Sequence, residues 1–254
     1  MRLIGESLAG ALAAAAGLNS QVRTHDVSNA ARLVQAHDAD LRAGLEDLIN
    51  DNRLAADVAA RSYWHSNGFA KLVVHVDDAN GWRLRLHVWP EAGRRRAGYQ
   101  NVHNHRWPFL AVVLCGAVRV QLFEEVDLPT DYTPQSFVKF VYDAGAPTLV
   151  APFRDVGGCM LRELDEVVCK AGDGHSCSTI ELHAVAADVP GTTATLVIQG
   201  PAQRRSALVY QRAGQPLLED TGERIAPEEV SDLASMTLAA MGSRVGTAPD
   251  MASP

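Results

Sequence analysis

Long apolar runs, paired cysteines and clusters of positive charge are all scarce in this chain. No run approaches the ~20 apolar residues that a helix needs to span a bilayer. The four cysteines show no Cys-x-x-Cys spacing, so neither a zinc knuckle nor a disulfide framework is indicated, and we expect reduced thiols. These absences disfavour a membrane protein and a small disulfide scaffold.

The distribution of charge disfavours a nucleic-acid partner. The formal net charge of −7 is spread along the chain, whereas phosphate binding needs clustered Lys and Arg. The one basic run, Arg94-Arg95-Arg96, is flanked by Gly and Ala and is typical of a solvated turn. Near the N-terminus Glu6 interrupts the apolar stretch, which favours a leading helix over a signal peptide. We therefore expect a cytoplasmic protein whose partner is a small molecule.

Helical patterns occur toward both ends of the chain. Apolar residues between Asp26 and Asn50 recur with the period of an amphipathic helix, and Asp26 is suited to cap its first turn. Pro227, followed by two glutamates, is typical of the first turn of a second helix, which we expect to end at Gly242.

Between these helices the pattern changes to short strands. The expected strands are 69–76, 82–89, 100–107, 110–114, 118–123, 137–142, 148–150, 160–168, 175–178, 183–186, 193–198 and 207–210. Many short strands separated by Gly, Pro and Asp, with no helical pattern between them, predict an antiparallel sandwich or barrel. The expected fold class is therefore mainly β.

Two histidines two residues apart, His103 and His105, lie in one of these expected strands. Side chains at i and i+2 of a strand project from the same face, roughly 6.5–7 Å apart, so both imidazoles can reach one metal ion. His183, in a later strand, fits the same scheme as a third ligand, and His175 is the weaker alternative. Three neutral imidazoles with open coordination positions predict a reactive metal centre.

The expected strand 82–89 is unusual because one of its faces carries Arg85, His87 and Trp89. It precedes the histidine strand across a short loop, so the two strands are candidates to pair. If this face lines the barrel, Arg85 offers a planar fork for a substrate carboxylate, and His87 a general base or a fourth ligand. A solvated face is the alternative. Glu181 is a candidate catalytic carboxylate, with a solvated turn residue as its alternative.

The spacing of these residues resembles the two motifs of the cupin superfamily. Gly98…His103-Asn104-His105…Gly116 is similar to the first motif without its usual Glu, and Gly172…His183 has the spacing of the second. The resemblance implies a cupin fold, a double-stranded β-helix or jelly-roll barrel, with helices at both ends and a metal held by the three histidines. The domains expected on this basis are an N-terminal helical extension (1–60), a cupin barrel (61–213) with an insertion at 124–160, a C-terminal helix (214–242) and a flexible tail (243–254).

Loss of that Glu is typical of the cysteine dioxygenase branch of the superfamily. Segment 84–89, a Gly-bearing loop and then 102–105 are similar to that branch, and the resemblance places the polar face of strand 82–89 in the pocket. It also places Lys71 near the family's arginine that holds the substrate carboxylate.

The resemblance implies a non-haem Fe(II) dioxygenase that uses O₂ on a small, carboxylate-bearing, amino-acid-like substrate. Lys71 and Arg85 would hold the anion, and His87 would move protons. The residues expected to exclude water are Trp89, Trp107 and Phe109.

Two other functions stay open. Three histidines also suit Zn(II) as a Lewis acid, and some cupins catalyse non-oxidative bond formation, isomerisation or lyase chemistry on amino-acid-derived substrates. Segment 195–199 reads Thr-Leu-Val-Ile-Gln where the branch has a Ser-x-His-x-Tyr triad, which favours this alternative. The other is a non-catalytic ligand-binding cupin. Cupin sheets commonly pair, so a homodimer is compatible with the many apolar strands.

Overall fold

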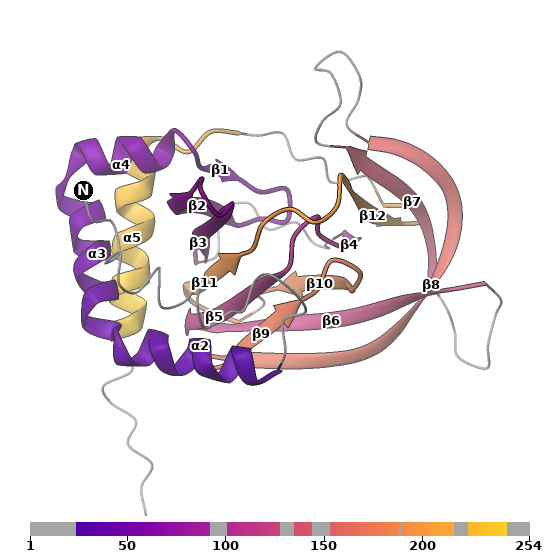
Figure 1. Cartoon of the computed structure of the whole chain (residues 1–254), viewed down its shortest axis with the longest axis horizontal. Coiled ribbons are helices and arrows are strands. Elements are labelled where there is room, and N and C mark those ends of the chain that lie inside the picture. Colours follow the sequence, from indigo (N-terminus) through magenta and orange to yellow (C-terminus); the bar gives the residue numbers. More distant parts are fainter. Residues whose placement is uncertain are drawn as a thin grey trace, which may run out of the picture.

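The computed structural model describes residues 24–91, 101–127, 135–143, 153–187, 189–215 and 223–242. Helices lie toward both ends of this sequence and antiparallel strands lie between them (Figure 1). The described helices are α2 (Thr24–Ala36), α3 (Asp38–Asn50), α4 (Asn52–Ala59) and α5 (Pro227–Gly242). The expected mainly β fold with helices at both ends is confirmed.

The strands form two antiparallel groups. The first is a six-stranded sheet in the order β1 (Tyr63–Trp64), β2 (Ala70–Asp77), β3 (Trp82–Trp89), β11 (Thr193–Gln199), β5 (Phe109–Cys115) and β9 (Gly174–Cys177). The second closes on itself in the order β10 (Leu182–Ala186), β4 (Val102–His103), β12 (Ser206–Arg212), β7 (Gln135–Asp143), β8 (Phe153–Lys170) and β6 (Ala117–Val126). We call them the helix-covered sheet and the closed sheet.

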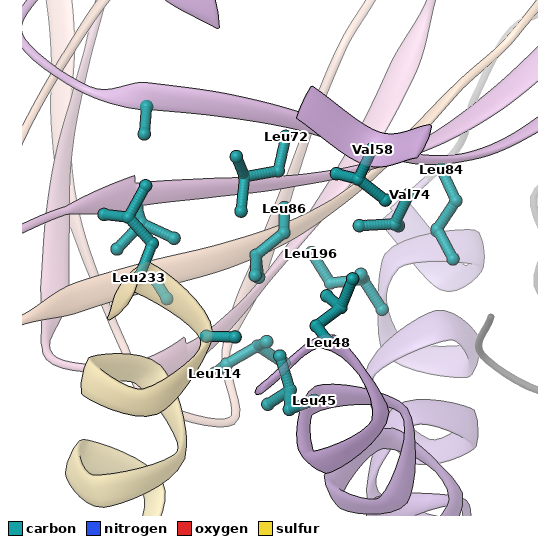
Figure 2. Close-up of a cluster of buried hydrophobic side chains, with 14 of the residues drawn as sticks. Leu45, Leu48, Val58, Leu72, Val74, Leu84, Leu86, Leu114, Leu196 and Leu233 are labelled. Atoms are coloured by element: carbon teal, nitrogen blue, oxygen red, sulfur yellow. The ribbon is translucent and has the colours of Figure 1, made fainter. Parts of the chain in front are cut away.

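The main hydrophobic core lies between the helices and one face of the helix-covered sheet (Figure 2). Leu84, Leu86 and Val88 of β3 point into this core, where Leu45 and Leu48 of α3 meet them. Because side chains alternate along a strand, the other face of β3 is turned away from the helices. That second face carries the polar residues of the strand.

The prediction of one helix from Asp26 to Asn50 is wrong in one respect, because the structure has two helices there, α2 and α3. The chain turns at His37, and the described part of α2 packs on β5 and β9 whereas α3 packs on α5. No large apolar residue lies between Val34 and Leu41, so nothing anchors a straight helix to the sheet through that turn.

Local capping explains where the other helices begin. The Asp51 carboxylate accepts hydrogen bonds from the backbone N–H groups of Arg53 (2.9 Å) and Leu54 (3.1 Å) at the start of α4. At α5 the Glu229 side chain reaches back and accepts from the backbone N–H of Ala226 at 2.9 Å. None of the described helices is long and apolar enough to cross a membrane.

The strand expected over 100–107 is also mostly wrong. Within the described part of that segment, only Val102–His103 is a strand, and residue 100 lies outside the described residues. The proposed pairing of strand 82–89 with the histidine strand is wrong as well. β3 pairs with β2 and β11, whereas β4 pairs with β10 and β12 in the closed sheet.

The segment expected as an insertion, 124–160, contributes regular structure to the closed sheet. It contains β7 and the first part of β8, which pair with each other over Gln135–Tyr142 and Phe153–Leu161. Several other expectations lie outside the described residues: the strand at 148–150, the basic run 94–96, Gly98, the leading helix and the tail 243–254.

Candidate metal centre

Three imidazoles meet where β4 and β10 face the helix-covered sheet. His103 and His183 are directly opposite each other in the antiparallel pairing of β4 with β10, and His105 follows two residues after His103. The Nε2 atoms of His105 and His183 are 2.9 Å apart. One ligand atom from each of the three rings lies within 4.8 Å of those of the other two. No other such cluster of metal-ligating side chains occurs among the described residues.

His105 lies in an irregular segment, and backbone bonds hold that segment in place. The backbone of Asn104 donates to the Leu208 carbonyl at 3.1 Å, and the carbonyl of Arg106 accepts from Gln203 at 2.7 Å. The carbonyl of Pro108 then accepts from Gly200 at 2.9 Å. The segment is therefore bound to β12 and to the residues that precede β12, although it is not a strand.

Burial keeps the three rings neutral. Desolvation lowers the pKa of His103 to about 4, and it lowers the pKa of His105 and of His183 well below the ordinary value. A neutral imidazole has a free lone pair on one nitrogen, which is the form that binds metal.

The tautomer of His103 is set by its neighbour. Its Nδ1 lies 3.0 Å from the backbone carbonyl of Asn101, and because a carbonyl only accepts, Nδ1 carries the proton. Nε2 is thereby left with the lone pair. A ligating histidine commonly bonds a carbonyl through its other nitrogen in this way, so the donor set fits a divalent transition ion.

A small cavity of about 60 Å³ lies beside the three histidines. Most of the residues that we expected at the site line it: Lys71, Arg85, His87, Trp89, Trp107 and Phe109. Glu181 does not. It is exposed in the turn before β10, where its carboxylate accepts from the backbone N–H of Ser178 at 2.5 Å. The structure therefore gives Glu181 the place of a turn residue and no contact with the cavity.

Arg85 is the most unusual residue of this cavity. Only 6% of it is exposed, its guanidinium lies over the ring of Trp107 at 5.1 Å, and no described carboxylate pairs with it. Burial lowers its pKa to about 10, which still leaves it charged at neutral pH. A buried charge without a partner is costly, so this guanidinium is poised to accept an anion.

Lys71 and His87 face the same cavity from neighbouring strands. They are opposite each other in the pairing of β2 with β3, and the Lys71 Nζ donates to the Tyr63 hydroxyl at 2.8 Å. Burial, together with the charges of Lys71 and Arg85, lowers the pKa of His87 well below its ordinary value. Its buried Nε2 has no hydrogen-bond partner among the described residues.

Two further histidines line the cavity: His65, which was not expected there, and His175, which was the weaker candidate ligand. His65 stacks on Phe69 at 4.6 Å between ring centroids, and its Nδ1 accepts from the backbone N–H of Asn67 at 3.2 Å. His175, weighed as a ligand, lies on the cavity wall edge-on to Phe109 but outside the three-histidine cluster. Its position eight residues before His183, in a segment expected to be a strand, was the sequence signal for His175. For His65 the sequence offers no signal.

A wider outer cleft of about 480 Å³ adjoins the cavity. The two share lining residues, among them Lys71, Arg85 and Trp107. Arg61, Arg83 and Arg106 line only the outer cleft, as do Tyr142 and Phe153. The last two residues come from β7 and β8, so the segment once expected as an insertion forms one wall of this cleft.

No protein-family model matches the chain, and no curated protein matches it either. The solved structures to which it is similar include cupin domains. The Drosophila melanogaster CENP-C cupin domain is 13% identical, with a TM-score of 0.22, over 58% of this chain and 71% of that chain. Drosophila melanogaster CENP-C bound to CAL1 is 13% identical, with a TM-score of 0.25, over 70% of this chain and 99% of that chain.

A third similar structure is hydroquinone 1,2-dioxygenase PnpCD in complex with Cd²⁺ and 4-hydroxybenzonitrile. It is 19% identical, with a TM-score of 0.22, over 63% of this chain and 71% of that chain. None of the three is described as a cysteine dioxygenase. Scores this low carry no functional argument, so function has to be argued from the site.

Proposed function

We propose that the chain is a cupin-type metalloenzyme, a non-haem Fe(II) dioxygenase that acts on a small, carboxylate-bearing substrate. The observation that carries the proposal is a buried guanidinium, Arg85, which no described carboxylate pairs and which lies in the same small cavity as three neutral histidines. The histidines would hold the ion, and the guanidinium would hold a carboxylate beside it.

The expected site residues that line the cavity each have a role in this proposal. Iron(II), when bound, would supply the redox chemistry that activates dioxygen. Arg85 and Lys71 would bind and orient the substrate carboxylate. His87 would hold or receive a proton at Nε2, which is buried and unpartnered among the described residues. The aromatic rings that would exclude water are Trp89, Trp107 and Phe109.

A zinc enzyme with non-oxidative chemistry is the second candidate. The specific observation that favours it is the inner face of β11, which gives the cavity only Thr195 and Val197. Neither side chain is an acid or a base near neutral pH. Zinc needs no redox partner, since it acts as a Lewis acid on a bound carbonyl or carboxylate.

Metal analysis of protein purified without added metal tests the metal centre. We expect about one transition ion per chain in the wild type, and loss of that ion in His103→Ala and His183→Ala. Arg85→Gln serves as the control, because it should keep the ion. Retention of full metal content by both histidine variants would refute the centre.

Reconstitution separates the iron and zinc candidates. Metal-free protein is loaded with Fe(II) or Zn(II) and given a panel of small amino acids and carboxylates, with oxygen uptake and substrate loss both recorded. Oxygen uptake in step with substrate loss, with iron alone, supports the dioxygenase. Turnover with zinc and without oxygen supports the second candidate. Tight binding with no turnover under either metal identifies a binding protein instead.

A further inference from the structure

Two arginines lie over one indole ring. The Arg85 guanidinium lies 5.1 Å from the centroid of Trp107, and the Arg106 guanidinium lies 5.0 Å from it. Arg85 lines both the inner cavity and the outer cleft, whereas Arg106 lines the outer cleft alone. Trp107 is therefore in contact with two cationic side chains, Arg85 beside the histidines and Arg106 in the outer cleft.

Within the described part of the chain, no carboxylate neutralises the arginines of the outer cleft. Neither Arg83 nor Arg106 forms an ion pair or a side-chain hydrogen bond among the described residues, and both charges depress the pKa of Arg85. The described residues that line the cavity and the cleft include no Asp or Glu. The chain as a whole carries a net charge of −7, so the charge of this region is opposite in sign to the net charge of the chain. Like charges focused in a cleft attract an anion.

The volumes of the inner cavity and the outer cleft limit which part of a ligand each can hold. The inner cavity, about 60 Å³, holds only the end of a small molecule. The outer cleft, about 480 Å³, is large enough for the rest. Because both spaces share Lys71, Arg85 and Trp107, one ligand can pass from the first into the second.

We propose that the substrate carries two anionic groups, a carboxylate held inside by Arg85 and a second oxyanion, carboxylate or phosphate, held in the outer cleft by Arg106 and Arg83. This inference rests on the proposed function and names its substrate class. An arginine fork binds either oxyanion through paired N–H donors, so the second group is defined by its charge. Tyr142 and Phe153, whose rings stack at 5.1 Å, provide an apolar wall for the part of the ligand between the two groups.

The test compares three probes by calorimetry on the full-length protein at low ionic strength. Pentanoate has one anionic group, glutarate has two carboxylates on a chain of equal length, and 4-phosphonobutyrate ends in a phosphonate. We expect at least one of the two dianions to bind about tenfold tighter than pentanoate, with a steeper loss of affinity as salt is added. The tighter of the two identifies the second group.

The variants locate the effect. Arg106→Gln should remove most of the preference for a dianion and weaken pentanoate binding far less. Arg83→Gln should reduce the same preference by a smaller amount. Arg53→Gln, an exposed arginine on α4, is the matched control and should change nothing. Circular dichroism checks that each variant is folded.

The result that overturns the inference is clear. Equal affinity for all three probes, no measurable binding of any, or an unchanged preference in both arginine variants contradicts it. The proposed function fails differently, through absence of a bound metal or turnover. Loss of pentanoate and dianion binding together in Arg85→Gln, with an intact metal centre, supports the inner anion site independently of the outer one.

Discussion

Asn104 and Leu208 hold each other by two hydrogen bonds. The Asn104 N–H donates to the Leu208 carbonyl at 3.1 Å, and the Leu208 N–H donates to the Asn104 side-chain oxygen at 2.7 Å. Asn104 lies between two candidate ligands, so β12 determines where the segment bearing His105 lies. The sequence predicted that the strand would continue to Trp107, whereas it ends at His103 and the Asn104 side-chain amide makes one of the next bonds to β12.

Replacing Asn104 with Ala should therefore loosen the metal site. We expect zinc or iron affinity to fall by about tenfold, because residues that orient ligands typically contribute that much. Metal competition with a chelator of known affinity measures the change. Asn80→Ala, in the turn between β2 and β3, is the control and should leave the affinity unchanged. Equal affinities in the two variants would show that Asn104 does not orient His105.

Local periodicity accounts for most of what could be predicted. Alternation along β3 correctly indicated that one face carries Leu84 and Leu86 and the other Arg85 and His87, because neighbouring side chains of a strand point to opposite faces. The presence of many short antiparallel strands likewise predicted the fold class. These features depend only on residues close together in the sequence.

What the sequence did not predict depends on pairing between distant segments. β3 and the histidine strand were expected to pair, but each found partners from the C-terminal half of the chain instead. The same holds for the outer cleft, whose wall includes Phe153 from β8 and Arg61 from the end of the helical segment. Register between strands far apart in sequence depends on packing of the whole sheet, which no single motif encodes.

Arg85→Met should stabilise the protein while abolishing anion binding. Arg85 is 6% exposed and its guanidinium has no carboxylate partner among the described residues, so its burial opposes folding. We expect a gain of about 1–3 kcal/mol in the free energy of unfolding, as is seen when buried charges become apolar groups of similar size. Urea denaturation measures it. The exposed Arg83→Met should change stability by less than about 0.5 kcal/mol. A destabilised Arg85→Met would mean that Arg85 has a structural partner.

The fold should lose stability as the pH falls below neutrality. Burial lowers the pKa of His175 to about 4 in the folded state, whereas the unfolded chain takes up that proton near 6.5. Between these values the unfolded state binds more protons, so stability is complete above about pH 6.5 and is lost as the pH falls toward 4.

His175→Gln removes the proton that His175 takes up on unfolding. We expect its unfolding free energy to fall less steeply between pH 6.5 and 4 than that of the wild type, by about 1.4 kcal/mol per pH unit at most. Denaturant titrations at several pH values give the two curves, and above pH 7.5 they should run parallel. Identical slopes throughout the acid range would show that His175 takes up its proton in the folded protein as readily as in the unfolded chain.

Gly116 should be irreplaceable at the turn between β5 and β6. Its φ is +69°, and a Cβ there would lie 2.9 Å from both the Cα and the Cβ of Thr193, with the Thr193 hydroxyl closer still. Gly191 provides the control, since its φ is +86° but a Cβ would meet no described atom within 4 Å. We expect Gly191→Ala to cost about 1–2 kcal/mol from backbone strain alone.

Gly116→Ala should cost more than twice as much, because β11 would have to move away from the turn. Since β11 lies between β3 and β5, that movement should also weaken anion binding in the inner cavity, where Thr195 and Val197 form part of the wall. Urea denaturation and pentanoate calorimetry on the two variants measure both effects. Equal losses of stability in the two variants would show that overlap with Thr193 contributes nothing beyond the left-handed backbone.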